Sequence, residues 1–425
     1  MNKDFILKGD ILYSTEEMII ESYPDSYLIC NDGKCEGVFT SIPEAYKGFP
    51  IEDYSGKIII PGLTDLHAHA PQYTFRGLGM DMELIDWLNE NAFPEEAHFE
   101  DLEYAKKAYS IFVDDLKNSA TTRAVIFGTL HKEATTLLMD MLDETDLVTY
   151  VGKVNMDRNG SEGLCEPDSA TAIRNTKEWI ENTKNKYKNT KPILTPRFIP
   201  SCSDELMHAI GEISSSENIR IQSHLSENPF EIRWVKELVP HSENYGDAYA
   251  GFNALGNTDT PAVMAHCVYV SNEEIELLKE HGTYVAHCPD SNMNLSSGIA
   301  PIRKLLNSKI NVGLGSDVAA GASLSIVQAM SHAIQVSKMY WRYVNSSYAP
   351  LKFNEAFYIG TLGGGKYFGK VGSFLKGYEF DALVIDDSKI RSTRATTLQE
   401  RCERMIYLPA EYTLISKYVK GQKIV

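Results

Sequence analysis

The sequence predicts an α/β protein: a closed (β/α)8 barrel of the TIM type, joined to a small β-sandwich that both ends of the chain form together. The 425-residue chain exceeds the roughly 250 residues typical of such a barrel, which leaves a surplus for a second domain. Apolar runs alternate with stretches of helical period from about residue 58 to 370, whereas both terminal regions resemble short strands. We therefore expect the β-sandwich over residues 1–59 and 373–425 and the barrel over residues 60–372.

The terminal regions contain segments typical of β-strands. The first sixty residues include FILKGDILYS (5–14), SYLIC (26–30) and GVFTSI (37–42), and the Asp32-Gly33 pair between the last two is a strong hairpin signal. We expect further strands in FDALVIDD (380–387), RMIYLPA (404–410) and VKGQKIV (419–425). These strands have to associate to bury their apolar faces, so one sandwich from both ends is expected.

The central region of the sequence predicts parallel strands, and these strands end in a histidine or an aspartate that could take part in catalysis. IRIQSH (219–224), AVMAHC (262–267), TYVAHCP (283–289) and INVGLGSD (310–317) are nearly continuous apolar runs, as expected of strands buried on both faces. MELIDWLNENAF (82–93) has a helical period, with Leu84 and Leu88 one turn apart. Because barrel enzymes carry their active residues at the carboxyl ends of strands, we expect the site where these runs end.

Composition excludes several classes of function. A net charge of −17 without a basic cluster opposes binding to nucleic acid or to an anionic membrane surface. No segment approaches the apolar length of about 20 residues that a membrane span needs, and Asp4 precedes any apolar run at the amino terminus. Seven scattered cysteines without a Cys-x-x-Cys pair suit reduced thiols. We therefore expect a cytoplasmic protein with neither a signal peptide nor an anchor.

Two histidines at the end of the first barrel strand form half of a metal site. KIIIPGLTDLHAHAPQ (57–72) places His67 and His69 two positions apart, and in an extended strand such side chains project to the same face. His224 and Asp317 stand at the ends of two later strands. Three imidazoles and a carboxylate suit zinc, with a position left for water. We expect one Zn²⁺ per chain on these four residues, with Fe²⁺ as the alternative.

Two further residues near strand ends fit the handling of protons. Glu227 follows His224 closely enough to lie beside a bound water, and a carboxylate in a dry pocket can titrate near neutrality. His266 is expected to orient or polarise that water. His287 ends the next strand, and we place it outside the metal site as a structural or pocket-lining residue.

Two weaker motifs do not support other functions. His131-Lys132-Glu133 matches the first half of a known His-x-Glu zinc signature, but no Pro-Cys-x-x-Cys follows, so we interpret it as the start of a helix. Gly313-Leu314-Gly315 lacks the third glycine of a dinucleotide-binding motif, because position 318 is valine.

Six segments carry a resemblance that spans most of the chain: PGLTDLHAHAPQYTFRGLGMDMELIDWL (61–88), TPRFIPSCS (195–203), IQSHLSEN (221–228), MAHC (264–267), AHCPDSNMNLSSG (286–298) and GLGSDVAAG (313–321). Together they resemble the guanine deaminase family of the amidohydrolase superfamily. The resemblance implies a zinc-dependent barrel with a flanking β-sandwich. It also implies the same metal ligands and the same roles for Glu227 and His266.

The resemblance further implies a substrate and a reaction. Gln72, Arg197 and Phe198 align with purine-binding positions of the family, and His224 and Glu227 would also contact the substrate. The implied reaction is the hydrolysis of guanine to xanthine and ammonia.

In that reaction activated water attacks C2 of guanine, and Glu227 passes the proton of the water to N3. Asp317 is expected to ligate the metal and also to accept a hydrogen bond from the attacking oxygen. One position departs from the family, because Asp290 stands where asparagine is more frequent.

Other functions remain open. A related deaminase could act on another nucleobase or a triazine, and a hydrolase of cyclic amides could use two metals, although Arg197 stands where such enzymes normally have a bridging lysine or glutamate. A non-catalytic scaffold would tend to have lost metal ligands. The expected partners are guanine and a second copy of the chain, with neither nucleic acid nor membrane.

Overall fold

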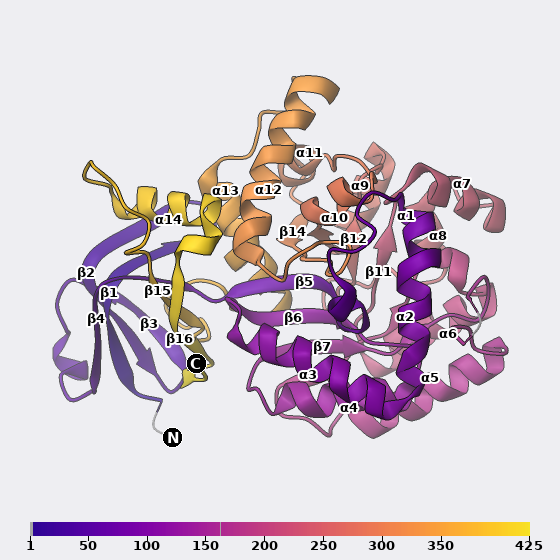
Figure 1. The fold of residues 1–425 in the computed structure, drawn as a ribbon, viewed down its shortest axis with the longest axis horizontal. Coiled ribbons are helices and arrows are strands. Elements are labelled where there is room, and N and C mark those ends of the chain that lie inside the picture. The colour runs from indigo at the N-terminus through magenta and orange to yellow at the C-terminus, as the bar shows by residue number, and fades with distance from the viewer. Residues whose placement is uncertain (1–2, 162) are drawn as a thin grey trace.

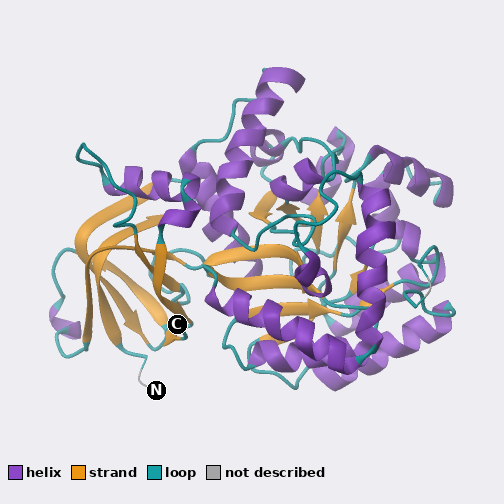
Figure 2. Cartoon of the chain, viewed as in Figure 1, coloured by secondary structure: helices purple, strands orange, loops and turns teal. Residues whose placement is uncertain are grey.

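The computed structural model describes residues 3–161 and 163–425 and consists of a barrel and a β-sheet placed side by side (Figure 1). Figure 2 shows the barrel strands inside a layer of helices, with the sheet at one side of them. The predicted α/β fold class is confirmed, including a terminal sheet made from both ends of the chain.

The terminal sheet joins strands from the first sixty residues to strands from the last fifty. In the described residues it has seven strands in the order β17-β16-β15-β4-β1-β2-β3. The turn between β2 and β3 uses Asp32 and Gly33 with positive φ angles, which confirms the predicted hairpin. The bounds are β1 (Phe5–Ser14), β2 (Ile20–Asn31), β3 (Lys34–Phe39), β4 (Ile51–Pro61), β15 (Ala382–Asp386), β16 (Thr413–Val419) and β17 (Gln422–Lys423).

This sheet curls around its own apolar cluster. Phe5 on β1 stacks on Tyr418 of β16 with ring centroids 5.4 Å apart, although β4 and β15 lie between their strands in the sheet order. The register of β1 against both neighbours shifts near Gly9, and a Cβ there would lie 2.8 Å from the Ile59 side chain. The two layers expected of a sandwich are therefore two parts of one bent sheet.

The barrel consists of parallel strands in chain order. In the described residues they occupy eight positions: β5 (Leu63–His69), β6 (Thr121–Phe127), β7 (Val148–Gly152) with β8 (Val154–Asn155), β9 (Thr190–Pro192) with β10 (Thr195–Pro196), β11 (Gln222–Leu225), β12 (Val263–His266), β13 (Tyr284–His287) and β14 (Asn311–Leu314). The Leu194–Ile221 bridge links the two halves. The Asp317 N–H donates to the His67 carbonyl at 2.7 Å, which brings the end of β14 back to β5.

Helices cover the outside of the barrel. Those between β5 and β9 are α1 (Leu84–Trp87), α2 (Phe93–Ala97), α3 (Leu102–Asn118), α4 (Lys132–Asp143) and α5 (Ser169–Thr183). The later ones are α6 (Asp204–Glu217), α7 (Pro229–Leu238), α8 (Tyr245–Gly251), α9 (Asn272–Glu280), α10 (Pro289–Asn294), α11 (Ile302–Asn307), α12 (Ile326–Met339) and α13 (Phe353–Tyr358). Helix α14 (Leu398–Tyr407) instead packs on the terminal sheet, against β1 and β2, and on α12 (Figure 1). The start of α4 after His131 confirms that the His-Lys-Glu motif begins a helix.

The strand expected at residues 404–410 is wrong, because this segment belongs to α14 and the turn that follows it. Thr397 and Glu400 form a reciprocal capping box at the start of the helix. Cys402, Met405 and Ile406 are buried at helical spacing. The Thr-x-x-Glu signature of a helix start is present in the sequence, although Ile406 and Tyr407 are residue types enriched in strands.

Buried charges join the terminal sheet to the barrel. Arg123 on β6 donates through Nε and Nη2 to the two carboxylate oxygens of Asp381, at 2.7 and 2.9 Å. Both side chains are almost completely buried, so each needs the other as a partner. Lys417 on β16 donates to the carbonyls of Ser119 and Thr121 at the start of β6. The sheet therefore packs on the barrel through specific polar contacts.

Replacing Asp381 by Ala is expected to destabilise the protein by about 3 kcal/mol, because buried Arg123 would lose its bidentate partner and keep only the partly exposed Glu379. A lowered midpoint of thermal unfolding would show this. Glu44→Ala provides the control, since the Lys47–Glu44 pair is exposed and such pairs contribute about 0–1 kcal/mol. Equal midpoints for the two variants would contradict a stabilising role for the Arg123–Asp381 pair.

Other features of the fold bear on the sequence-based expectations. All seven cysteines are free thiols, as predicted. Among the described residues no helix has both the length and the apolar character needed to cross a membrane. The domain division into 1–59 with 373–425 and 60–372 stays a prediction.

Candidate active site

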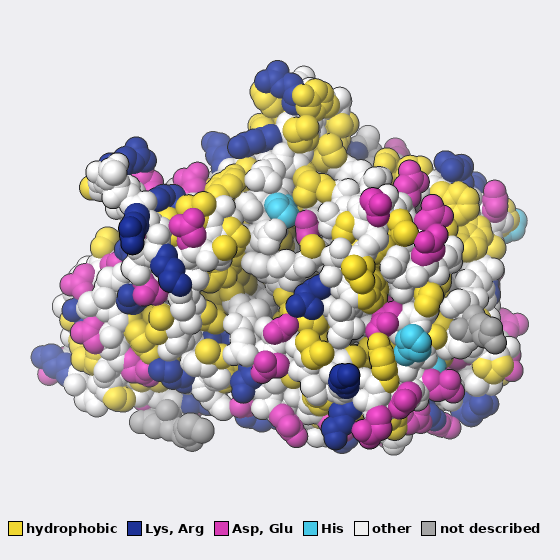
Figure 3. Space-filling view, in the orientation of Figure 1, with side chains coloured by type: hydrophobic (Ala, Val, Ile, Leu, Met, Phe, Trp, Pro, Cys, Tyr) yellow, Lys and Arg dark blue, Asp and Glu magenta, His cyan; other side chains and the backbone are white. Residues whose placement is uncertain are grey.

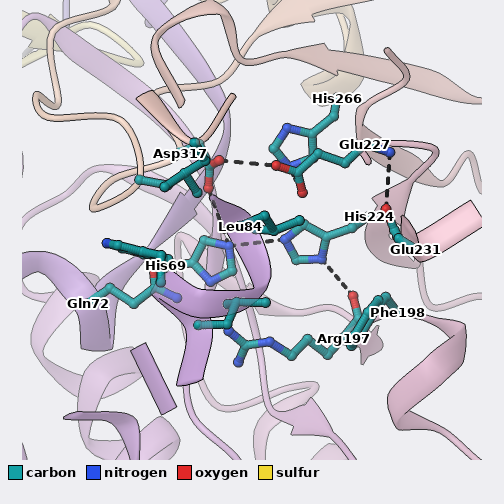
Figure 4. Close-up of a pocket in the computed structure, with 14 residues that line it drawn as sticks. His69, Gln72, Leu84, Arg197, Phe198, His224, Glu227, Glu231, His266 and Asp317 are labelled. Carbon is teal, nitrogen blue, oxygen red and sulfur yellow. Dashed lines mark hydrogen bonds and ion pairs between the residues drawn. The ribbon is translucent and has the colours of Figure 1, made fainter. Parts of the chain in front are cut away.

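The carboxyl ends of four barrel strands bring the predicted residues together. His67 and His69 end β5, His224 lies on β11, His266 ends β12 and Asp317 follows β14. All five belong to a small group of facing side chains, and Figure 4 shows His69, His224 and Asp317 pointing toward one another. The prediction that these runs end at one place is therefore consistent with the geometry.

The four predicted metal ligands have the spacing of a coordination shell. The Nε2 atom of His69 lies 3.2 Å from Nε2 of His67 and 3.2 Å from Nε2 of His224. Asp317 Oδ1 lies 3.2 and 3.5 Å from Nε2 of His67 and His69. Donors placed tetrahedrally at about 2.1 Å from an ion are about 3.4 Å apart, so this set fits a zinc-like cation.

The protonation states of these groups also suit a metal. Burial lowers the pKa of His67, His69 and His224, so all three imidazoles are neutral at neutral pH. His224 Nδ1 lies 2.6 Å from the Arg197 carbonyl, which can only accept, so Nδ1 carries the hydrogen and Nε2 keeps its lone pair. Burial alone would raise the pKa of Asp317, but the nearby imidazoles outweigh it and lower that pKa well below its usual range. The cluster is a metal-binding site.

Backbone packing between β5 and β14 sets the position of two of these ligands. Gly315 lies so close to β5 that a Cβ would come within 2.9 Å of the His67 Cβ atom, so a larger residue would separate the strands. The buried Asp65 carboxylate accepts from the backbone N–H groups of His67 and Ser316. His67 and Asp317 are thus held near each other by the strands that carry them.

Glu227 lies beside this cluster with partners on both carboxylate oxygens. Ser297 donates to Oε1 at 2.8 Å, and His266 Nε2 lies 3.4 Å from Oε2. His266 Nδ1 is 2.9 Å from the Asn292 side-chain oxygen, so Nδ1 carries a hydrogen and Nε2 faces Glu227 and Asp317. Burial raises the pKa of Glu227 above that of an ordinary glutamate. A carboxyl group in this environment can both accept and return a proton near neutral pH.

The charge environment of His266 differs from that of the three predicted ligands. Burial lowers its pKa, but the carboxylates of Glu227 and Asp317 outweigh burial and raise it overall. His287, on the next strand, is buried and lies outside both candidate metal groups of the described residues, and burial lowers its pKa to about 3. Its placement outside the metal site agrees with the sequence-based expectation.

The predicted substrate residues lie on one pocket with the metal site. Gln72, Arg197 and Phe198 line it together with His69, His224, Glu227, His266 and Asp317. In Figure 4, Gln72 and Arg197 lie on the side away from Glu227. Its apolar wall comes from α1 and the turn after it, through Leu84, Trp87 and Leu88. The pocket therefore has one apolar wall, with Glu227 at one polar end and Gln72 and Arg197 at the other.

Asp290 lies outside the residues that line this pocket. Its Oδ2 accepts from the Ala322 backbone N–H at 2.9 Å, and its Oδ1 is 3.2 Å from His332 Nδ1. Asp290 thus supports the loop after Asp317, and an asparagine oxygen could accept the same backbone hydrogen.

Comparison with known proteins gives one answer for the whole chain. The profile of the Amidohydrolase family matches residues 58–421. Guanine deaminase of Dictyostelium discoideum is 37% identical over 99% of this chain and 98% of its own length. The chain belongs to the guanine deaminases of the amidohydrolase family. Human guanine deaminase is 36% identical over 99% of this chain and 96% of its own length.

A solved structure among the guanine deaminases has the same fold throughout. The crystal structure of guanine deaminase from C. acetobutylicum, with guanine bound in its active site, is 46% identical and superposes with a TM-score of 0.95. The match covers 99% of this chain and all of that one.

Sequence reasoning missed three residues that hold side chains of the pocket in place. Asn292 and Ser297, the partners of His266 and Glu227, stand within the quoted segment AHCPDSNMNLSSG, so their polar character could have been used. Glu96, which contacts Arg197 and Gln72, had no such signal, because Glu95 beside it is of the same type.

Proposed function

We propose that this protein hydrolyses guanine to xanthine and ammonia at the pocket formed by the metal cluster, Glu227, Gln72 and Arg197. The observation that carries the proposal is the meeting of a proton-transfer carboxylate with a metal-binding cluster beside two hydrogen-bonding side chains. The full-length similarity to guanine deaminases supports guanine as the substrate. Release of ammonia from guanine by the purified protein is the direct test.

His67, His69, His224 and Asp317 would hold the metal. A metal ion bound there would lower the pKa of water from 15.7 to about 7 and would so supply a nucleophile at neutral pH. Glu227 accepts the proton of the attacking water and delivers it to N3 of the ring. His266, held by Asn292, faces the same space and orients the water.

Water supplies all the atoms that the hydrolysis adds to guanine. The oxygen of water bonds to C2 of guanine. One proton of the water passes through Glu227 to N3 and stays on xanthine, the other goes to the exocyclic amino group, and the bond from C2 to that group breaks to release ammonia. Glu227 takes part in both proton movements, while Asp317 accepts a hydrogen bond from the attacking oxygen. Arg197 and Gln72 hold the ring by hydrogen bonds, and Phe198 and the apolar wall exclude water from its face.

We further propose Zn²⁺ as the metal, one ion per chain, because three nitrogens and one carboxylate suit zinc and match its ligand spacing. Fe²⁺ is the alternative. The proposed compartment is the cytoplasm.

A homodimer is also proposed. The exposed apolar tip formed by Met339, Tyr343 and Val344 projects from the body at the end of α12 and is visible in Figure 3 as a hydrophobic group at the top. A mass of about twice the chain in light scattering would support it.

Adenine is expected to react about a hundredfold less efficiently than guanine, because a donor placed for the ring carbonyl would be left buried and unmatched. The measurement is kcat/KM for both bases by ammonia release. Comparable values would favour a deaminase of a different specificity on the same metal site.

Replacing Ser297 by Ala is expected to shift the acid limb of the pH profile of kcat/KM for guanine to higher pH by about one unit. Burial raises the pKa of Glu227, and the Ser297 hydrogen bond partly offsets this by stabilising the carboxylate. Without that bond Glu227 is protonated at higher pH, so the proton acceptor is lost sooner as pH falls. Ser373→Ala, which removes a buried hydroxyl bonded to Ser14 in the terminal sheet region, should leave the limb in place.

A further inference from the structure

A buried carboxylate behind the pocket contacts both polar side chains that line its far end. Glu96 is 1% exposed and accepts from Nη1 and Nη2 of Arg197 at 2.6 and 3.0 Å, and from Nε2 of Gln72 at 2.8 Å. The Gln72 oxygen in turn accepts from the Ala319 backbone N–H at 3.4 Å. Both side chains are therefore fixed in one orientation before any ligand enters.

The short helix α2 provides these contacts through two residues on one face. Phe93 and Glu96 are three positions apart, so their side chains lie next to each other. The Phe93 ring centroid is 4.9 Å from the Arg197 guanidinium carbon, and Glu96 holds the end of the same group. Helix α2 thus covers one face and one edge of the guanidinium.

This arrangement changes what Arg197 offers to a ligand. The bidentate pair occupies two of the five guanidinium N–H groups and leaves three for other acceptors. It also cancels the positive charge, because Glu96 and Arg197 are both buried and in direct contact. The far end of the pocket therefore presents hydrogen-bond donors with no excess positive charge.

We propose that Glu96 is a positioning and specificity-determining residue that makes the pocket favour uncharged purines over purine anions. The inference rests on the proposed function and extends it to the product. Guanine is uncharged at neutral pH, whereas xanthine is more acidic, and an unpaired Arg197 would retain its anion. Glu96 thereby aligns the substrate and limits retention of the product.

The test compares two inhibitors in the metal-loaded protein: hypoxanthine, which is uncharged, and urate, which is an anion at neutral pH. In Glu96→Gln the KM for guanine and the inhibition constant of hypoxanthine are expected to rise about tenfold, because the alignment of Arg197 and Gln72 is lost. The inhibition constant of urate is expected to fall about tenfold, because Arg197 then carries an uncompensated charge. An unchanged ratio of the two constants would overturn the proposal.

Two further variants separate this role from a merely structural one. Glu96→Asp keeps the charge but shortens the reach, so the KM should rise while the inhibitor ratio stays at the wild-type value. If Glu96→Gln does not fold, Glu96→Asp serves as the test. An unchanged KM for guanine, or a changed ratio of the two inhibition constants, would then contradict the proposal. Asp381→Asn weakens another buried pair, with Arg123, and should lower the thermal midpoint without altering the ratio.

Different results would refute the proposed function and the role of Glu96. A wild-type protein that releases no ammonia from guanine would refute the proposed function. A wild-type protein that does so, with a Glu96→Gln variant of unchanged inhibitor ratio, would refute only the role of Glu96.

Discussion

Replacing Glu227 by Gln is expected to reduce kcat for guanine by about 10³-fold while the metal stays bound. The amide has nearly the shape of the carboxyl group and can keep the hydrogen bond from Ser297, but it cannot accept and return a proton at neutral pH. Ammonia release and metal content would be measured on the same sample. Undiminished ammonia release would remove Glu227 from its proposed role.

Glu274 offers a matched control for this substitution. It is buried to 3% exposure, compared with 4% for Glu227, and accepts from the backbone N–H groups of Gly246 and Ser271. An amide oxygen can accept one of these bonds, so Glu274→Gln is expected to keep kcat close to that of the wild type. A similar loss in both variants would indicate a general effect of neutralising buried glutamates.

Removing the metal with a chelator is expected to reduce turnover by more than about 10⁴-fold, because water without the ion has a pKa of about 15.7. It should also lower the midpoint of thermal unfolding, since a ligand that binds only the folded state stabilises it. Adding back Zn²⁺ or Fe²⁺ separately would show which ion restores activity. Full activity in a sample verified to be free of metal would refute the proposed mechanism.

Two histidine variants test which imidazoles hold the ion. His67→Ala is expected to lose metal stoichiometry, because the Nε2 atom of His67 lies 3.2 Å from donors on both His69 and Asp317. His287→Ala removes an equally buried imidazole that lies outside the metal groups of the described residues, so it should retain the ion. Metal loss in His287→Ala alone would mean that the ligands are assigned wrongly.

The sequence predicted the residues of the site better than their partners. His67 and His69 could be paired because strand periodicity fixes their common face, and β5 is a strand as expected. Their distance to His224 and Asp317 depends on barrel closure, which local periodicity does not encode. Whether Arg197 would be paired with a carboxylate depended on the position of α2, a five-residue helix in the excursion between β5 and α3.

The wrong assignment at residues 404–410 has a similar cause. Short segments rich in Ile and Tyr are ambiguous between strand and helix, and here the helix is decided by its cap and by the packing of Cys402 and Met405. The curl of the terminal sheet was equally inaccessible, because Phe5 and Tyr418 are separated by nearly the whole chain.

Strand β4 has consequences for how the chain emerges from the ribosome. Its apolar residues Ile58, Ile59 and Ile60 pair on one edge with β15, which is synthesised more than three hundred residues later. Until then that edge stays open, and an unpaired apolar edge invites association with other nascent chains. The terminal sheet must therefore be completed after translation has nearly finished, so the growing polypeptide depends on protection of β4 for most of its synthesis.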